Sequence, residues 1–223
     1  MTAPDPPDFA HVRTWVFDLD NTLYPPEADL FGQMHPRMAR FLMEELGVDR
    51  PEAERLRDLY YHEHGTTLAG LIALHGTDPA RYLEDVHQID FSVLAPDPAL
   101  RDAIAALPAR RIVFTNGPRH YAGRVLEAIG LAGCFAAVYG IEEAGMTSKP
   151  AREAFETVFA QDGLDPAAAA MVEDDVRNLA VPHAMGLRTV LLAHDPLPAP
   201  PPPHVDHVTG DLTAFLRALA PAG

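Results

Sequence analysis

The sequence predicts an α/β fold: a doubly wound, mostly parallel sheet with helices on both faces and an α-helical subdomain inserted after the first strand. Short apolar runs rich in β-branched residues, without polar alternation, are typical of parallel strands buried on both faces. Helix caps separate the later runs. A long stretch of helical pattern separates the first run from the second. These three observations together favour an α/β core with an insertion.

Four segments have the composition of buried strands. They are residues 14–17, 111–114, 170–172 and 188–192. An edge strand is expected near residues 205–208, followed by a terminal helix at 212–219. The proline-rich residues 197–203 are expected to form a stiff surface loop and not an interdomain linker. Only about twenty residues follow this segment, and they are too few for a second core.

Helices are expected between these strands. Pro118 opens one that Gly130 closes, and Pro150 opens another that ends near Gly163. Within residues 24–108 the helical pattern covers 30–46, 51–65, 66–76 and 79–87, and a further helix begins at 97–98. Pro36 either kinks the first of these or marks its true start. A βαβ crossover needs one helix, so we expect a helical subdomain over 24–99 and a core formed by 1–23 and 100–223.

Composition excludes several classes of protein. The chain has 223 residues, of which 48% are hydrophobic, and its formal charge is 17 − 32 = −15. The apolar content can fill a core, and the acidic excess excludes a nucleic-acid polymer as partner. No apolar run reaches the roughly 20 residues that span a bilayer. Residues 1–8 lack the features of a signal peptide, and Cys134 is the single cysteine, so we expect a cytoplasmic protein.

Two acidic residues follow the first strand directly. Ligands of open α/β sheets bind at the carboxyl ends of strands, and alternation in an extended segment points Asp18 and Asp20 the same way. Two such carboxylates repel each other unless a cation lies between them, and Mg²⁺ is the simplest such cation. The alternative is a polar turn in which Asp20 or Asn21 caps the next segment.

Polar residues also follow later strands. Thr115 and Asn116 precede the helix at Pro118 and offer an anion site, or an ordinary helix cap. Lys149 could neutralise phosphoryl oxygens, or be a solvated lysine. Residues 173–175 are three consecutive acids, which are costly to bury without a metal; the alternative is a solvated helix start favoured by the helix dipole. Their common position at strand ends favours one catalytic site.

These residues resemble the four motifs of the haloacid dehalogenase-like hydrolase superfamily. The motifs are Asp18-Leu19-Asp20-Asn21-Thr22-Leu23, Thr115-Asn116-Gly117, Lys149-Pro150 and Glu173-Asp174-Asp175. The helical insertion resembles the mobile cap of that superfamily, so the fold it implies is a Rossmann-like core with a cap. Residues 18–25, 64–71 and 171–179 resemble the pyrimidine 5′-nucleotidase-like branch more closely.

The resemblance implies a mechanism. Asp18 would be the nucleophile that forms an aspartyl-phosphate, and Asp20 would act as general acid and then general base. Dehalogenases of this superfamily lack a carboxylate at the position of Asp20, so its presence favours a phosphatase. The Thr115 hydroxyl and the Asn116 backbone N–H would bind phosphoryl oxygens, and Lys149 would balance their charge.

The resemblance also implies a magnesium cofactor. Mg²⁺ would be held by the Asp18 carboxylate, the Asp20 backbone carbonyl and Asp174. Two positions depart from the pattern. Asp175 stands where a small hydroxyl residue is frequent, and Asn178 replaces the second acid of the fourth motif. Asp175 is therefore an additional candidate ligand.

The expected substrate is a small phosphorylated metabolite. A pyrimidine nucleoside 5′-monophosphate is preferred; the alternatives are a sugar phosphate or other metabolite, or a catalytically silent phospholigand-binding protein. Candidates for binding the leaving group are Tyr24, His64, Thr66 and Thr67, because Gly65 and Gly70 permit a tight turn there. Thr66 could equally cap the next helix. The chain is expected to be a monomer or a homodimer.

Overall fold

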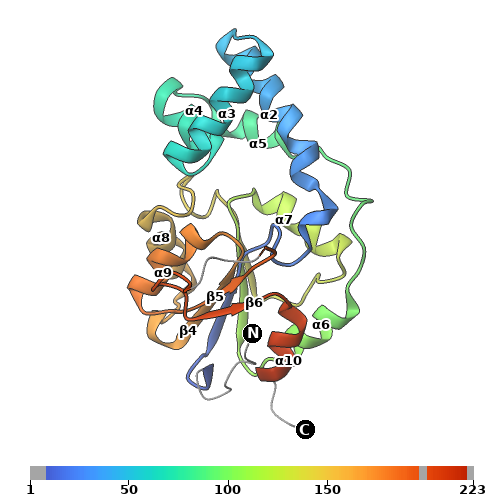
Figure 1. Ribbon diagram of the computed structural model, residues 1–223, viewed down its shortest axis with the longest axis vertical. Helices are drawn as coiled ribbons and strands as arrows, with labels where there is room; N and C mark the ends of the chain where they lie inside the picture. Colours follow the sequence, from blue (N-terminus) through green and yellow to red (C-terminus); the bar gives the residue numbers. More distant parts are fainter. Residues whose placement is uncertain (1–8, 196–199, 220–223) are drawn as a thin grey trace.

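The computed structural model describes residues 9–195 and 200–219. Its core is a six-stranded sheet in the order β3-β2-β1-β4-β5-β6, and every pairing that the structure describes is parallel. The strands are β1 (Thr14–Phe17), β2 (Arg110–Phe114), β3 (Ala137–Tyr139), β4 (Ala169–Glu173), β5 (Arg188–Leu192) and β6 (His207–Thr209). The predicted doubly wound α/β fold is confirmed (Figure 1).

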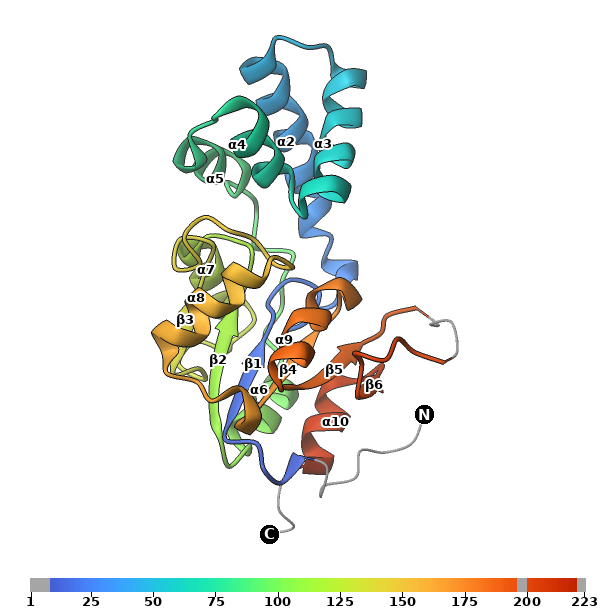
Figure 2. The ribbon, with the colours of Figure 1, turned by 90° about the vertical axis from the view of Figure 1, so that its left-hand side faces the viewer.

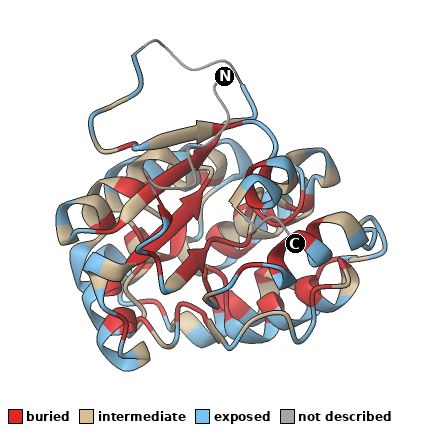
Figure 3. Cartoon of the chain, turned by 90° about the horizontal axis from the view of Figure 1, so that it is seen from below, coloured by how far each residue is buried: buried red, intermediate tan, exposed pale blue. Residues whose placement is uncertain are grey.

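Helices cover both faces of the sheet. One face packs against α6 (Pro98–Ala105), α7 (Arg119–Ala128) and α10 (Leu212–Leu219), and the other against α8 (Arg152–Asp162) and α9 (Ala180–Met185). Because side chains alternate along a strand, Trp15 and Phe17 enter the first of these cores and Val16 enters the second. Strands β1, β2, β4 and β5 are mostly buried and the edge strands β3 and β6 are half-buried, whereas the outer faces of the helices are exposed (Figure 3).

Four further helices lie beyond the carboxyl ends of the strands (Figures 1 and 2). They are α2 (Leu30–Leu46), α3 (Arg50–His64), α4 (Thr67–His75) and α5 (Pro79–Val86), and we call them the cap helices. They have an apolar interior of their own, where the rings of Phe41 and Tyr82 meet edge to face at 5.1 Å. By contrast, α6 lies on the core, next to α10.

Pro36 lies inside α2. The helix starts at Leu30, where the Asp29 carboxylate accepts a hydrogen bond from the Gly32 N–H at 3.0 Å. The alternative that Pro36 marks the start of the helix is therefore wrong. The helix accommodates Pro36 at the loss of one backbone hydrogen bond, because proline has no N–H to donate to the carbonyl of residue 32.

A few elements differ from expectation. Strand β3 and helix α9 are not among the predicted elements, and the edge strand lies at 207–209, slightly later than expected. Residues 1–8, and 197–199 of the predicted proline-rich loop, lie outside the described residues, while 200–203 are exposed or half-buried. Within the described ranges, no helix is both long and apolar enough to cross a membrane.

Candidate functional site

The central strand β1 places the first candidate residues of the site. Its register pairs Phe17 with Val113 of β2 and with Val172 of β4. Asp18 extends this ladder, since its N–H donates to the Val172 carbonyl at 3.0 Å. The residues that follow three neighbouring strands therefore meet at one edge of the sheet.

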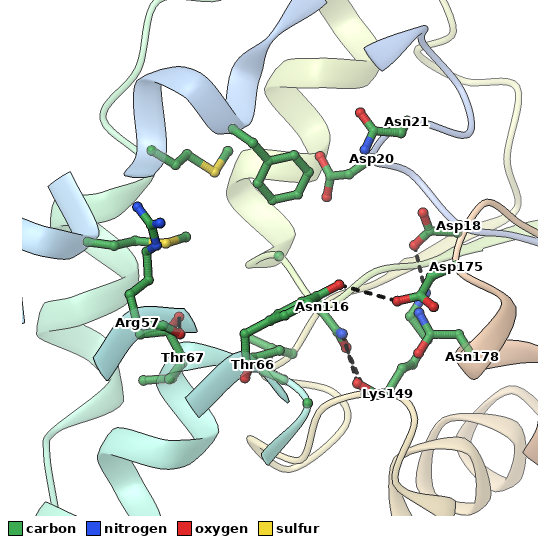
Figure 4. A pocket seen from close by; sticks show the side chains of 18 of the residues that line it. Asp18, Asp20, Asn21, Arg57, Thr66, Thr67, Asn116, Lys149, Asp175 and Asn178 are labelled. Atoms are coloured by element: carbon green, nitrogen blue, oxygen red, sulfur yellow. Dashed lines mark hydrogen bonds and ion pairs between the residues drawn. The ribbon is translucent and has the colours of Figure 1, made fainter. Parts of the chain in front are cut away.

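Lys149 reaches this edge from the loop between β3 and α8. Its side chain is 1% exposed, and Nζ donates to Asp18 Oδ1 at 2.6 Å, Glu173 Oε1 at 2.7 Å and the Phe114 carbonyl at 3.0 Å. The alternative of a solvated lysine does not hold. Figure 4 shows Lys149 and Asp18 at the same end of the site.

The residues after β2 organise the loop that carries Lys149. The Asn116 amide donates to the Lys149 carbonyl at 3.0 Å, and the Lys149 N–H donates to Asn116 Oδ1 at 2.8 Å. Thr115 is fully buried; its hydroxyl accepts from the Gly117 N–H at 2.9 Å and donates to Asp20 Oδ2 at 3.3 Å. The side chains of the second motif therefore hold the first and third motifs in place.

Glu173, the first acid of the fourth motif, is the most buried acid of the site. It ends β4 with 0% exposure. Besides Lys149, it accepts from the Asn178 amide at 2.7 Å and from the Asp175 N–H at 2.9 Å. Asn178 thus supports Glu173. The next residue, Asp174, is half-buried and accepts a long hydrogen bond of 3.5 Å from the Thr22 hydroxyl.

Burial and mutual repulsion perturb these carboxyl groups. Burial and the nearby Glu173 carboxylate raise the pKa of Asp18, against the opposing effect of Lys149. The same two causes raise the pKa of Asp174 to about 7. Burial lowers the pKa of Lys149, but the Asp18 and Glu173 carboxylates outweigh it and raise that pKa above its ordinary value. The site therefore holds more negative charge than its lysine balances.

This donor set fits a hard divalent cation. One carboxylate oxygen from each of Asp18, Glu173 and Asp174 lies within 4.8 Å of the others. Three carboxylates and one lysine leave two negative charges uncompensated, and all three ligand atoms are oxygens, which Mg²⁺ prefers. Because Glu173 already binds Lys149 and Asn178, Asp18 and Asp174 are the freer members of the set.

Asp175 is not part of that cluster of three acids and has other partners. Its carboxylate accepts hydrogen bonds from Arg177 at 2.6, 3.0 and 3.1 Å and from the Tyr61 hydroxyl at 3.4 Å. Burial raises its pKa, but the hydrogen bonds from Arg177 bring it below the usual value. Arg177 also bonds to Tyr61, which belongs to α3. Asp175 and Arg177 therefore join the core to a cap helix.

A cavity of about 580 Å³ separates the strand ends from the cap helices. Asp18, Asp20, Asn116, Lys149 and Asp174 line its core side. The cap side has a mixed lining. It includes the apolar and aromatic side chains of Phe31, Met34, Met38, Leu68 and Tyr82 and the polar or charged side chains of His35, Arg57, Asp58 and His62. In Figure 4, Arg57 and Thr67 lie across the cavity from Asp18.

Of the four candidate residues for leaving-group binding, two line the cavity. Thr66 and Thr67 line the cavity, and Thr66 also caps α4 by accepting the Ala69 N–H at 3.0 Å. His64 is not among the lining residues, and its ring lies against Tyr60. The hydroxyl of Tyr24 donates to Asp20 Oδ1 at 2.6 Å.

Only one of the two glycines belongs to the expected turn. Gly65 has a φ of +87° and ends α3, as expected. Gly70 lies inside α4, where a Cβ would come within 2.5 Å of the Tyr60 side chain. The expectation that Gly70 serves a tight turn is wrong: its lack of a side chain lets α4 pack closely on α3.

Several residues that line or support the site have no signal of their own in the sequence. Tyr121 reaches the site from α7, Arg57 and Tyr61 reach it from α3, and Arg177 reaches it from the turn after β4. Glu173 is different, because it is one of the three consecutive acids that the sequence already indicates are costly to bury without a compensating charge.

Comparisons with known proteins identify the family of the chain. The family model of haloacid dehalogenase-like hydrolases matches residues 12–186. Phosphate metabolism protein 8 of Saccharomyces cerevisiae is 32% identical over 211 residues, which cover 84% of this chain and 63% of the yeast protein. The chain thus spans less than two thirds of that relative.

Solved structures share the fold at lower identity. A phosphatase from Thermococcus onnurineus has a TM-score of 0.61 at 19% identity and covers 90% of this chain and 94% of its own. The hydrolase YfnB from Bacillus subtilis, bound to magnesium, has a TM-score of 0.58 at 20% identity, covering 93% and 98%. L-2-haloacid dehalogenase from Xanthobacter autotrophicus has a TM-score of 0.57 at 17% identity, covering 95% and 100%. On its sequence motifs, its site and these matches, the chain belongs to the haloacid dehalogenase-like hydrolase family.

Proposed function

We propose that this protein is a Mg²⁺-dependent phosphomonoester hydrolase that works through an aspartyl-phosphate on Asp18. The observation that carries the proposal is the convergence of Asp18, Lys149 and Asp174 at one end of the cavity, with Asp20 beside them. A nucleophile, a cation and a second carboxyl group are what phosphoryl transfer requires. The similarity to a yeast protein of phosphate metabolism and to a Thermococcus phosphatase supports phosphatase chemistry.

Each residue has a role in this proposal. The Asp18 carboxylate attacks phosphorus, and Lys149 holds that carboxylate while offsetting negative charge on the transferring group. Asp20 protonates the leaving oxygen and then accepts a proton from the water that hydrolyses the aspartyl-phosphate. The N–H groups after β2 bind phosphoryl oxygens.

Mg²⁺ would be held by the Asp18 carboxylate, the Asp20 backbone carbonyl and Asp174. When bound, it supplies positive charge that neutralises the phosphoryl group next to an acidic nucleophile. The magnesium-bound structure of YfnB supports this choice of cation.

We further propose that the substrate is a nucleoside 5′-monophosphate, preferably of a pyrimidine. The cavity is within the size range of small-molecule sites. Acidic groups and one lysine line it at the sheet, and apolar side chains together with Arg57 and Asp58 line it at the cap. A planar base would pack against Phe31, Met34 and Met38, and the Arg57 guanidinium would donate to its carbonyl oxygens.

The first test is hydrolysis of p-nitrophenyl phosphate by the purified chain with Mg²⁺, with EDTA, and as Asp18→Asn. Activity is expected only in the wild-type chain with Mg²⁺. The control is Asp102→Asn, which neutralises an exposed acid on α6 and should leave activity unchanged. Activity that survives in EDTA or in Asp18→Asn would refute the mechanism.

The second test compares kcat/KM for CMP, UMP, their deoxy forms, AMP, GMP and sugar phosphates. The highest values are expected for CMP and UMP. Equal values for all bases, or a preference for sugar phosphates, would leave the phosphatase proposal standing and overturn the nucleotide assignment.

A further inference from the structure

Two buried tyrosine hydroxyls converge on a single oxygen of Asp20. Tyr24 and Tyr121 each donate to Asp20 Oδ1 at 2.6 Å, and the two hydroxyl oxygens are 3.4 Å apart. Tyr24 is 4% exposed and Tyr121 is 1% exposed. The carboxyl group is therefore clamped at one of its two oxygens, by groups that water does not reach.

The clamp distinguishes the two oxygens of the carboxyl group. Oδ1 accepts two short hydrogen bonds, which occupy its lone pairs. Oδ2 has one longer contact, of 3.3 Å, with the Thr115 hydroxyl. Asp20 itself lines the cavity. Oδ2 is thus the oxygen that is available to hold a proton and pass it to a bound ester.

Packing on both sides fixes the ring of Tyr121. On one side, a Cβ at Gly117 would lie 2.9 Å from Tyr121 Cδ1, so the lack of a side chain at this glycine leaves room for the ring. On the other side, the ring centroid lies 4.8 Å from that of His87 and 5.8 Å from that of Phe91. His87 and Phe91 belong to the segment that returns from the cap helices to α6, and Tyr24 belongs to the segment that leads out to them.

We propose that Tyr121, together with Tyr24, is a positioning residue that holds the general acid Asp20 with Oδ2 directed at the ester oxygen. This inference rests on the proposed function. In the first step, the Asp18–phosphorus bond forms, the phosphorus–ester oxygen bond breaks, and the proton on Asp20 Oδ2 passes to that oxygen. In the second step, Asp20 Oδ2 takes a proton from the attacking water, the bond between the water oxygen and phosphorus forms, and the Asp18–phosphorus bond breaks to release inorganic phosphate.

The test uses two substrates that differ by one nitro group. Phenolate is a stronger base than p-nitrophenolate, so phenyl phosphate depends more on protonation of its leaving oxygen. General acid catalysis contributes about 10²–10⁴-fold, and we expect Tyr121→Phe to lower kcat for phenyl phosphate about 10-fold or more. For p-nitrophenyl phosphate the expected fall is below about 3-fold. KM should stay unchanged for both, because the tyrosines do not bind the ester.

Tyr24→Phe removes the other hydroxyl and is expected to act in the same direction; the double variant should show the largest difference between the substrates. Tyr139→Phe is the matched control. It removes the hydroxyl of a buried tyrosine that donates to Asp162 at 2.8 Å, and it should leave kcat unchanged for both substrates. Thermal unfolding verifies that each variant folds, and the two single variants give independent tests should one of them not fold.

Equal losses on both substrates, or a change in KM alone, would show that the tyrosines are merely structural and would overturn the inference. So would a wild-type chain that hydrolyses p-nitrophenyl phosphate but not phenyl phosphate, because Asp20 would then not act as an acid. Failure of the proposed function looks different: wild-type chain hydrolyses neither ester, or Asp18→Asn retains activity, and this inference then fails with it.

Discussion

Lys149 provides the sharpest test of how the site is held together. It is the only lysine in the sequence, and it is 1% exposed, between the carboxylates of Asp18 and Glu173. Lys149→Met keeps the approximate shape of the side chain and removes its charge. It therefore leaves two buried acids facing each other without the cation that lies between them.

The structure sets the expected magnitude. Removing one partner of a buried ion pair costs about 3–5 kcal/mol, a large part of the roughly 5–15 kcal/mol that stabilises a typical domain. Arg101→Met is the matched control, because Arg101 and Asp102 are 2.9 Å apart, but their side chains are 50% and 68% exposed. An exposed pair of this kind contributes less than about 1 kcal/mol.

The free energy of unfolding is measured by urea titration in EDTA, since a divalent cation would offset the missing charge. The fluorescence of Trp15 reports unfolding, because it is the single tryptophan and is buried in β1. The double variant Lys149→Met/Glu173→Gln should lose less stability than the sum of the two single variants, by about 0.5–3 kcal/mol, because it also removes one of the repelling charges. Hydrolysis of p-nitrophenyl phosphate by Lys149→Met should fall about 10²–10³-fold.

Two results would refute this reasoning. One is a loss of stability in Lys149→Met no larger than that in Arg101→Met. The other is strict additivity of Lys149→Met and Glu173→Gln. Either would mean that the charges near Asp18 are solvated or already neutral, and that the lysine is not needed to hold them.

Three further predictions concern other contacts. Mg²⁺ should raise the midpoint temperature of thermal unfolding of the wild-type chain, because a ligand that binds the folded state stabilises it. Asp174→Asn should abolish that rise, and an equal rise in both chains would contradict the assignment of Asp174 as a metal ligand. Burial lowers the pKa of His87 in the folded chain below the value of about 6.5 that a histidine has in the unfolded chain. As the pH falls through that value, the unfolded chain binds a proton that the folded chain does not, and the folded chain loses stability. Denaturation at pH 7.5 and 5.5 should therefore show a smaller acid loss in His87→Gln, and an unchanged loss would refute this. Arg177→Ala removes the contact to Tyr61 of α3 and should raise KM about 2- to 10-fold in steady-state kinetics, whereas an unchanged KM would show that this contact does not help to hold substrate.

The sequence predicts the sheet well because the signal of a buried parallel strand is local. The runs at 14–17 and 188–192 coincide with β1 and β5. The elements that were not predicted are short: β3 has three residues, and α9 has six and contains Pro182. Three residues do not establish a period, and a proline argues against a helix. Their positions are set by packing on the rest of the core.

The residues of the site also fall into a group whose positions the sequence predicts and a group whose contacts it does not. Strand order and register bring Asp18, Thr115 and Glu173 to one edge, and these positions follow from the strands alone. The contacts that orient the side chains do not. Tyr121 lies 101 positions from Asp20, and Arg177 lies 116 positions from Tyr61. No periodicity links such residues, so only the folded chain reveals that they meet.

The difference between informative and uninformative residues is energetic. An acid at the end of a buried strand is unfavourable unless a cation or hydrogen bonds compensate it, so its presence in the sequence already demands a partner. Glu173 meets that demand with Lys149 and Asn178. A residue such as His64 lies at a helix end where many side chains are equally stable, so its type carries no such demand. For this reason the sequence predicts the candidate catalytic residues at the strand ends, whereas the residues of the cap that line the cavity are identified only in the folded chain.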